Sequence, residues 1–494
     1  MTRTPAALRR DRLTDLPVDV ERPTYAVTDL SPGIVHIGVG NFHRAHQAWY
    51  LHRLMQQGAA RDWAIIGAGV RPGDARMRET LRAQDYLTTL IELRPDASSA
   101  EVTGAMIDFF PVEADNASLI AGMAHPSTRI VSLTVTEGGY FVNPATGSFD
   151  ACHPDILHDA QNPNTPRTAF GAIVAALALR RAEGAGSFTI QSCDNVQGNG
   201  DVTRAATVSL ARLSDPDLAE WIDRTCSFPN SMVDCIVPTT GPAEVQKARA
   251  IGIEDAAPVT HEFYRQWVME DDFCAGRPDW DLVGATFTDR VHDYETMKIR
   301  VLNGGHQVLA NVGELLSVPT IADCMAHPLI SAFFRKVVAE EIVPYVTPVP
   351  DHTPKQYSEL VAQRFSNPAI LDTTRRVAFD GSSRHPGFVL PSVRDALAVG
   401  GPVEGLALVE ALWARMCAGQ REDGSTIEPN DPQWEVLQQT ALAAKAHPHL
   451  WLDQSTLYGR PADLGRFTAS FERSLADIWA NGVERTVGGY TKGR

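Results

Sequence analysis

A lysine, an asparagine and a histidine lie close together in the segment KIRVLNGGH, at positions 298, 303 and 306. The segment belongs to a longer run, 293–316, whose apolar residues recur with the period of a helix. At about 100° per residue, Asn303 lies about 140° and His306 about 80° around the helix from Lys298. We therefore expect all three side chains on one helix face.

These side chains suit the oxidation of an alcohol without a metal ion. Hydride removal from a secondary alcohol requires a base for the hydroxyl proton and donors for the developing alkoxide. A lysine is such a base when desolvation lowers its pKa, an asparagine donates to the oxygen, and a histidine orients the substrate or relays a proton. The same three residue types are also compatible with a helix that has no catalytic role, with a solvated polar face and a histidine in the core. Gly304 and Gly305 each cost about 1 kcal/mol in a helix, which indicates that something approaches the backbone there.

A nucleotide-binding turn is the second candidate feature. Residues 34–47 read IVHIGVGNFHRAHQ, a β-branched run followed by two glycines and a helical pattern. In this context the first glycine permits a tight turn, and the second lets a pyrophosphate approach the helix N-terminus. His43 replaces the third glycine of G-x-G-x-x-G, and a plain structural turn can also have this pattern. The residues expected to contact the cofactor here are Gly38, Gly40, Asn41, Phe42 and Arg44.

The second strand bears on the choice of cofactor. In GAGVRPGDARM, residues 67–77, Arg71 comes first and Asp74 follows after a short turn. An acid there binds the ribose hydroxyls of NAD, whereas an arginine accepts the 2′-phosphate of NADP. We expect NAD, with NADP left open. Thr136 and Glu137 end another apolar run, where a cofactor would pass, and we expect them to contact it as well.

The elements that must position these residues alternate in the first part of the chain. Nearly continuous apolar runs separated by helical patterns predict an α/β fold with a Rossmann-type, mostly parallel, doubly wound sheet. After about residue 285 helical patterns dominate, so we expect a sheet domain over 1–287 and a mainly α-helical domain over 288–494. The expected strands are 34–39, 64–70, 86–93, 129–135, 187–193 and 232–237.

Bulk properties exclude several classes of protein. The 494 residues carry a formal net charge of −16, which disfavours nucleic acid and anionic membranes as partners. The seven cysteines are dispersed without a C-x-x-C pair, which favours reduced thiols in the cytoplasm over disulfides or a zinc site. Neither a signal-peptide pattern nor an 18-residue apolar run is visible. We expect a cytoplasmic protein with no membrane segment and no metal.

Several motifs together resemble the polyol-specific long-chain dehydrogenase/reductase family, the mannitol 2-dehydrogenase-like proteins. The main ones are GVGNFHRAH, SCDN and K-x-x-x-x-N-x-x-H. TVTEGGY, FPNSMVDCIVP, QWVMEDDF and FDGSSRHP support them in the family's order, from residue 34 to about 390. The family's own glycine turn carries FHRAH, so the resemblance accounts for the missing glycine.

The resemblance implies a metal-independent NAD(P)-dependent enzyme with a Rossmann-type domain followed by a helical domain. It implies that Lys298 is the general base, that Asn303 and Asn195 hold the reacting oxygen, and that His306 orients the substrate. It further implies that Asp234 contacts substrate hydroxyls or tunes the lysine. Arg376 resembles a substrate-contacting arginine, and Arg384 stands where many members have lysine.

The function we expect is reversible oxidation of D-mannitol to D-fructose, a small polyol–ketose pair, by a monomer or homodimer. D-Arabinitol and D-sorbitol are competing substrates. A hexuronate oxidoreductase, acting on fructuronate or tagaturonate, is the alternative within enzymes, because Arg376 and Arg384 could pair with a carboxylate. A sensor that binds NAD(H) without turnover is the alternative outside enzymes.

Overall fold

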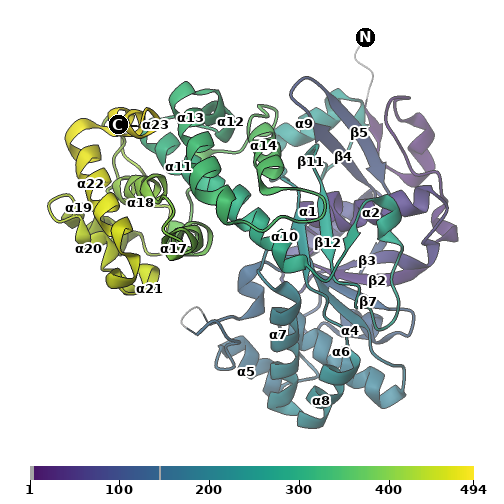
Figure 1. Ribbon diagram of the computed structural model, residues 1–494. Coiled ribbons are helices and arrows are strands. Elements are labelled where there is room, and N and C mark those ends of the chain that lie inside the picture. Colours follow the sequence, from purple (N-terminus) through teal and green to yellow (C-terminus); the bar gives the residue numbers. More distant parts are fainter. Residues whose placement is uncertain (1–4, 144–145, 494) are drawn as a thin grey trace. The chain divides into compact units, whose positions relative to one another are not determined.

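The computed structural model describes residues 5–143 and 146–493, which form two compact units (Figure 1). Unit 1 comprises Met1–His292 and unit 2 comprises Asp293–Arg494. Unit 1 is built on a parallel sheet covered by helices. After Phe287, every regular element in the described part of the chain is a helix. The expected fold class, a Rossmann-type domain followed by a helical one, is confirmed.

The main sheet of unit 1 has the order β6-β3-β2-β7-β8, and all neighbouring strands are parallel. The first strand of the sheet along the chain, β2, lies in its middle. The chain adds β3 and β6 on one side of β2 and then β7 and β8 on the other, so the order reverses between β2 and β7. In open α/β sheets, ligands bind at the carboxyl ends of the strands at such a reversal. The strands are β2 (Pro32–Ile37), β3 (Ala64–Ala68), β6 (Met106–Phe109), β7 (Ile130–Leu133) and β8 (Thr189–Ser192).

Both faces of this sheet are buried, which explains its apolar strands. In β2, Val35 and Ile37 pack into a core shared with helices α4 (Ala117–Ala124), α6 (Ala169–Glu183) and α7 (Asn199–Ser214). Ile34, on the opposite face, packs into a second core with α2 (Gln47–Gln56). A strand covered on both sides cannot alternate apolar with polar residues, so its sequence reads as a continuous apolar run.

Two expected strands belong to smaller sheets rather than to the main one. The run 86–93 forms β4 (Thr88–Leu93), which pairs with β5 (Ser98–Thr103) and β11 (Val259–Glu262). The run 232–237 forms β9 (Ser231–Asp234), which pairs antiparallel with β12 (Gln266–Met269), itself paired with β13 (Thr286–Phe287). The third strand of the main sheet, β6, was missed because its four residues, MIDF, do not form an apolar run.

Unit 2 is a helical assembly around α11, which contacts α13, α15 and α18. The helix that contains Lys298 starts as α10, continues as a π-helix over Lys298–Asn303 and becomes α11 at Gly304. The α-helices are α10 (Val291–Met297), α11 (Gly304–Leu315), α12 (Ile321–Ala326), α13 (Pro328–Val337), α14 (Pro354–Phe365), α15 (Thr374–Val377), α16 (Gly381–Arg384), α17 (Leu390–Ala398), α18 (Glu404–Cys417), α19 (Trp434–Ala444), α20 (His449–Leu452), α21 (Ser455–Tyr458), α22 (Arg466–Asn481) and α23 (Val483–Thr491).

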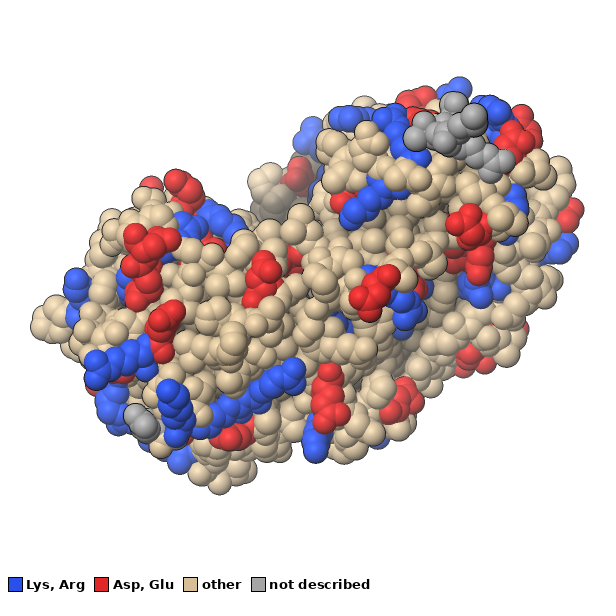
Figure 2. Space-filling view, turned by 90° about the horizontal axis from the view of Figure 1, so that it is seen from above, with Lys and Arg blue, Asp and Glu red and all other residues tan. Residues whose placement is uncertain are grey.

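Charged side chains are mixed on the surface. On the face drawn in Figure 2, basic and acidic groups lie interspersed among uncharged ones, and neither sign gathers into one large patch.

In residues 5–143 and 146–493, none of the helices has both the length and the hydropathy to cross a bilayer.

Buried histidines make unit 1 sensitive to acid. Burial lowers the pKa of His36 to about 3, and burial together with the nearby Arg265 lowers that of His261 to about 3. The unfolded chain binds these protons below about pH 6.5 and the folded chain does not. The free energy of unfolding should therefore fall as the pH drops from 6.5 towards 3, by up to about 1.4 kcal/mol per pH unit for each group.

The substitution His261→Gln tests this prediction. Thermal unfolding followed between pH 7 and 5 should show a shallower loss of stability in the variant than in the unmodified protein. His447→Gln, at an exposed position, is the matched control and should leave the pH dependence unchanged. Equal slopes in all three proteins would contradict the assignment.

Candidate active site

The glycine turn follows β2 where the order of the main sheet reverses. Gly38 has φ +99°, and a Cβ at this position would overlap the carbonyl oxygen of Thr134, just beyond β7. Thr134 Oγ1 also donates to Gly38 O at 2.5 Å. The ends of β2 and β7 therefore approach more closely here than a side chain allows.

Gly40 is a glycine for a different reason. Its φ of −93° is accessible to any residue, and a Cβ there would meet only Gly38 O, at 3.9 Å. Neither packing nor backbone conformation demands a glycine, yet the residue is exposed directly before α1 (Asn41–Ala45). The open backbone matches what close approach of a pyrophosphate requires.

The structure places Arg44 inside the protein instead of at the exposed turn. Its guanidinium donates to Gly40 O at 3.3 Å, to Asn41 Oδ1 at 2.7 Å and to Ala257 O. Burial lowers its pKa to about 10, so it remains charged at neutral pH. Carbonyl and amide oxygens of the protein thus occupy most of the guanidinium, and a contact between Arg44 and a cofactor stays a prediction. Arg44 fixes the shape of the turn.

Asn41 and Phe42 are also held by the protein. Asn41 Nδ2 donates to Pro238 O and to Thr240 Oγ1, both at 2.9 Å. The ring of Phe42 is half-buried and stacks on that of His46, with 4.7 Å between the ring centroids. Contacts of these two residues with a cofactor stay a prediction.

Asp74 begins α3 (Asp74–Ala83), shortly after β3 ends. Its Oδ2 accepts a hydrogen bond from the Arg71 backbone N–H at 3.0 Å. A Cβ at Gly69 would overlap the Asp74 side chain, so this glycine lets the carboxylate lie against the end of β3. An acid beside the second strand, next to β2, is the arrangement expected for binding ribose hydroxyls.

Thr136 and Glu137 are exposed in the loop after β7. The loop is tied to Asp194, whose Oδ2 accepts from Val135 N at 2.9 Å and whose Oδ1 accepts from Thr136 N at 3.0 Å. Our reading of the sequence missed Asp194. The signal available was its position inside SCDN, directly after β8 and beside Asn195.

Lys298 and Asn303 lie at the two ends of the π-helix in unit 2. A π-helix closes its hydrogen bonds between residues i and i+5, as shown by the bond from Gly304 N to Ile299 O. Two residues five apart are then about one turn apart, instead of about 140° around a regular α-helix. This geometry favours a shared face for Lys298 and Asn303 through a π-helical turn instead of the α-helix that we expected; the place of His306 on that face stays a prediction. Lys298 is buried, at 8 % exposure.

The two glycines after Asn303 allow close packing of neighbouring parts of unit 2. A Cβ at Gly304 would lie 3.1 Å from Phe388 O, in the π-helix His385–Val389. A Cβ at Gly305 would lie 3.0 Å from the ring of Phe334. The group that approaches this backbone is therefore the protein itself, which brings the π-helix after Arg384 against the one that carries Lys298.

His306 is a neutral imidazole in a charged neighbourhood. Burial lowers its pKa to about 3; the Asp372 carboxylate opposes this shift, and three nearby arginines add to it. The ring stacks on Phe365 with 4.1 Å between centroids. Within the described chain, His306 Nε2 and Asn303 Oδ1 are buried without a hydrogen-bond partner. Buried polar atoms normally find partners, so this pair is compatible with the predicted contact to substrate, which stays a prediction.

Asp372 holds Arg376 near His306. It accepts from Arg376 Nε at 2.6 Å and Nη2 at 2.7 Å, and its Oδ2 lies 3.8 Å from His306 Nε2. Arg384 Nη1 donates to Val377 O at 2.6 Å. The structure thus brings the predicted residues His306 and Arg376 together through an aspartate that our reading of the sequence missed. Its spacing of four residues from Arg376 was the available signal.

Asn195 and Asp234 belong to unit 1. Asn195 is exposed in the segment after β8, whereas Asp234 is the last residue of β9 and is buried at 4 % exposure. The predicted residues thus form a unit 1 group at the glycine turn and the ends of β8 and β9, and a unit 2 group around the π-helix. No set of three His, Cys, Asp or Glu side chains in the described ranges is arranged to hold a metal ion.

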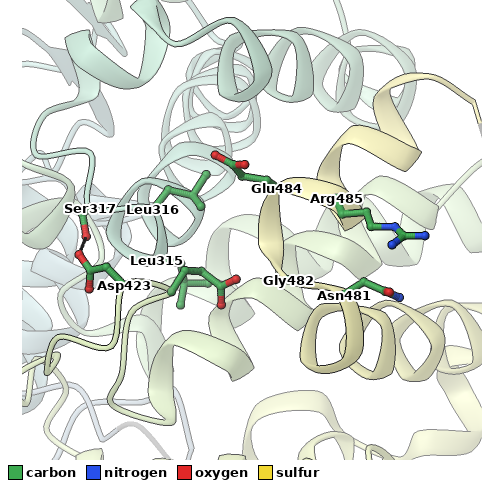
Figure 3. Close-up of a pocket in the computed structure, with 9 residues that line it drawn as sticks. Leu315, Leu316, Ser317, Asp423, Asn481, Gly482, Glu484 and Arg485 are labelled. Carbon is green, nitrogen blue, oxygen red and sulfur yellow. Dashed lines mark hydrogen bonds between the residues drawn. The ribbon is translucent and has the colours of Figure 1, made fainter.

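A pocket of about 650 Å³ lies at the far end of α11, away from Lys298 (Figure 3). Ser317 Oγ donates to Asp423 Oδ2 at 2.6 Å on its wall. No residue predicted for the active site lines it, so it is separate from the π-helix group. The lining residues are Leu315, Leu316, Ser317, Glu422, Asp423, Asn481, Gly482, Glu484 and Arg485.

Curated relatives match along nearly the whole chain. A mannitol 2-dehydrogenase of Cereibacter sphaeroides is 55% identical over 468 residues, which cover 95% of this chain and 98% of the relative. A mannitol 2-dehydrogenase of Pyricularia oryzae is 40% identical over 493 residues, covering 97% of this chain and 98% of that relative.

Solved structures and family models agree with these relatives. The Pseudomonas fluorescens mannitol 2-dehydrogenase, solved as a ternary complex with NAD and D-mannitol, is 41% identical with a TM-score of 0.89, covering 99% of this chain and 100% of the other. A substrate-free D-sorbitol dehydrogenase is 33% identical with a TM-score of 0.89, covering 97% and 100%. The model of the mannitol dehydrogenase Rossmann domain matches residues 32–282, and that of the C-terminal domain matches 290–479. The chain therefore belongs to the mannitol dehydrogenase family.

Proposed function

We propose that this protein is an NAD-dependent polyol dehydrogenase that interconverts D-mannitol and D-fructose. The observation that carries the proposal is the match, over 99% of this chain, to a mannitol 2-dehydrogenase solved with NAD and D-mannitol. The buried, unpaired Asn303 Oδ1 and His306 Nε2 support it independently, because a polyol presents several hydroxyls to such atoms.

The residues of unit 1 fit a dinucleotide. Gly40 leaves the backbone before α1 open for a pyrophosphate, and Asp74 offers a carboxylate to the ribose hydroxyls. We propose that Gly38, Gly40 and Asp74, with Thr136 and Glu137, hold the cofactor. Asp74 favours NAD over NADP, whose 2′-phosphate it would repel. When bound, the nicotinamide supplies the acceptor for the hydride of the alcohol carbon.

Lys298 is the proposed base. In oxidation its uncharged amine takes the proton of the C2 hydroxyl, and in reduction its ammonium returns that proton to the carbonyl oxygen. Asn303, one π-turn away, donates through its amide to the same oxygen and leaves the proton to the lysine. Asn195 is proposed as a second donor. Two amide donors stabilise the alkoxide that develops as the proton leaves.

We propose that the charged side chains around His306 bind the remaining hydroxyls of the polyol. His306 is neutral at physiological pH, so one ring nitrogen accepts from a hydroxyl and the other donates. Arg376 is held by Asp372 with its free guanidinium edge available to substrate oxygens. Arg384 is proposed to donate to a terminal hydroxyl, and Asp234 to accept from one. We further propose that the enzyme is cytoplasmic, which fits seven cysteines that form no disulfide, and that it is a monomer or homodimer.

A spectrophotometric screen at 340 nm tests the proposal. D-Mannitol, D-sorbitol, D-arabinitol and D-mannonate are each supplied with NAD or with NADP at equal concentrations. We expect the highest kcat/KM with D-mannitol and NAD. A preference for D-sorbitol, favoured by the 33% identical sorbitol dehydrogenase, would reassign the substrate. A preference for D-mannonate would support a hexuronate enzyme, and binding of NADH without turnover would support a sensor.

Asp372→Asn should weaken the hold on Arg376. The amide keeps one acceptor oxygen and loses the other, so the paired contact at 2.6 and 2.7 Å cannot persist. We expect KM for the polyol to rise about tenfold, the size of one charged hydrogen bond, with a smaller change in kcat. Asp323→Asn, on α12, is the control and should leave both unchanged. An unchanged KM in Asp372→Asn would contradict the role of Asp372.

A further inference from the structure

Thr136 has a backbone conformation that non-glycine residues rarely adopt. Its φ is 68° and its ψ is 165°. Ala60, Asn116, Phe141 and Asp380 also have positive φ, but their ψ values of 26° to 46° place them in the ordinary left-handed helical region. The Thr136 region is essentially restricted to glycine, and such residues persist only where their surroundings hold them.

The Asp194 carboxylate is what holds Thr136. Its two oxygens accept the consecutive N–H groups of Val135, at 2.9 Å, and Thr136, at 3.0 Å. Both bonds fix the peptide planes on the N-terminal side of the strained residue. Gly139 N donates to Thr136 O at 2.9 Å and closes the turn on its other side.

Tyr140 and Ser192 hold the carboxylate in turn. Tyr140 donates to Asp194 Oδ2 at 2.7 Å, Ser192 Oγ lies 2.6 Å from the Tyr140 hydroxyl, and Asp194 N donates to Ser192 Oγ at 3.2 Å. The three groups form a closed ring of hydrogen bonds, in which the Ser192 hydroxyl donates to Tyr140. Tyr140 and Ser192 are buried, at 1 % and 0 % exposure. The ring therefore anchors the exposed loop in the end of the sheet.

We propose that Asp194 is a positioning residue that holds Thr136 in its strained conformation and so shapes the loop 134–140 for cofactor binding. The inference rests on the proposed function, in which Thr136 and Glu137 contact NAD. A threonine in a glycine conformation indicates that its side chain is needed there. Because Asp194 directly precedes Asn195, the same segment of chain fixes the cofactor loop and carries a proposed donor to the reacting oxygen.

The test is a double-mutant cycle with Asp194→Asn and Thr136→Gly. The asparagine amide cannot accept both N–H groups, so Thr136 should relax and the loop should move. We expect the Kd for NADH, from fluorescence titration, to rise about ten- to a hundredfold, as for loss of a charged hydrogen bond. Glycine adopts the same conformation without help. In the Thr136→Gly background, Asp194→Asn should therefore change Kd by less than about threefold.

Asp159→Asn is the matched control. Asp159 also accepts two consecutive N–H groups and a hydroxyl, from Arg167 N at 2.7 Å, Thr168 N at 3.0 Å and Thr168 Oγ1 at 2.7 Å. Thr168, however, is in ordinary extended conformation, with φ −99° and ψ 160°. The control should lower thermal stability and leave the Kd for NADH unchanged.

Hydrogen exchange separates this inference from the proposed function. Amides of residues 137–140 should exchange faster in Asp194→Asn, and Thr136→Gly should reduce this effect, whether or not NADH binds. Unchanged exchange in Asp194→Asn, or an equal penalty in both backgrounds, would overturn the inference. An unmodified protein that does not bind NADH contradicts the proposed function, and exchange then still decides whether Asp194 holds the loop.

Discussion

Replacing Lys298 by methionine should lower kcat for polyol oxidation by about three orders of magnitude, the range for loss of a general base. The aliphatic stem of methionine keeps most of the packing at this buried position, and only the proton acceptor is removed. The Kd for NADH should remain within about twofold, because the residues proposed to hold the cofactor, Gly38, Gly40 and Asp74 among them, are unaltered. Stopped-flow rates and NADH titration measure the two effects separately.

The pH profile gives the second readout for Lys298. In the unmodified enzyme the rate of oxidation should rise with pH as the ammonium loses its proton, and the methionine variant should lack this rise. Lys355→Met, at an exposed position in the first turn of α14, is the control and should keep both rate and profile. A Lys298→Met enzyme with more than a tenth of normal turnover would remove the lysine from the mechanism.

Alanine at Gly38 should lower the stability of the fold, whereas alanine at Gly40 should weaken cofactor binding. At Gly38 the added Cβ overlaps Thr134 O, and φ of +99° is unfavourable for alanine, so we expect a loss of about 3 kcal/mol in the stability of unit 1. At Gly40 the fold has room, so the melting temperature should be unchanged. The same methyl group would stand where a pyrophosphate approaches, and the Kd for NADH should rise at least about tenfold.

Chemical denaturation and NADH titration of both variants distinguish these outcomes. The pair is its own control, because the two glycines are two residues apart and the substitutions are identical. If Gly40→Ala bound NADH normally, the open backbone before α1 would not be the phosphate site. If Gly38→Ala were as stable as the unmodified protein, the contact with Thr134 O would not limit the turn.

Most of the fold could be predicted from the sequence because burial on both faces leaves a clear pattern. The runs at 34–39 and 129–135 are mostly apolar, and both proved to be interior strands of the main sheet, β2 and β7. Strand β6 could not be found in this way, since four residues that include Asp108 give no such run. Pairing of 86–93 and 232–237 outside the main sheet depends on partners far along the chain, which local patterns do not reveal.

The candidate site was likewise predicted only in part from the sequence. Residue types and spacing singled out Lys298, Asn303 and His306, but apolar periodicity cannot distinguish hydrogen bonds to i+4 from bonds to i+5, so the π-helix was not foreseen. Arg44 was expected at the phosphates because a charge beside a glycine turn looks functional, and only the fold shows Ala257 O beside it. Asp194 acts by holding Thr136 at a positive φ angle, and this angle cannot be predicted from the residue types in the sequence.

The π-helix has one consequence for how this chain tolerates insertions and deletions. A turn closed between i and i+5 holds one residue more than an α-helical turn, so it amounts to an extra residue accommodated without breaking the helix. Deleting a single residue between Lys298 and Asn303 would leave the flanking helices in phase and the molecule folded. The lysine and the asparagine would then stand four residues apart on a regular α-helix, about 40° around it, so the amine and the amide would still share one face.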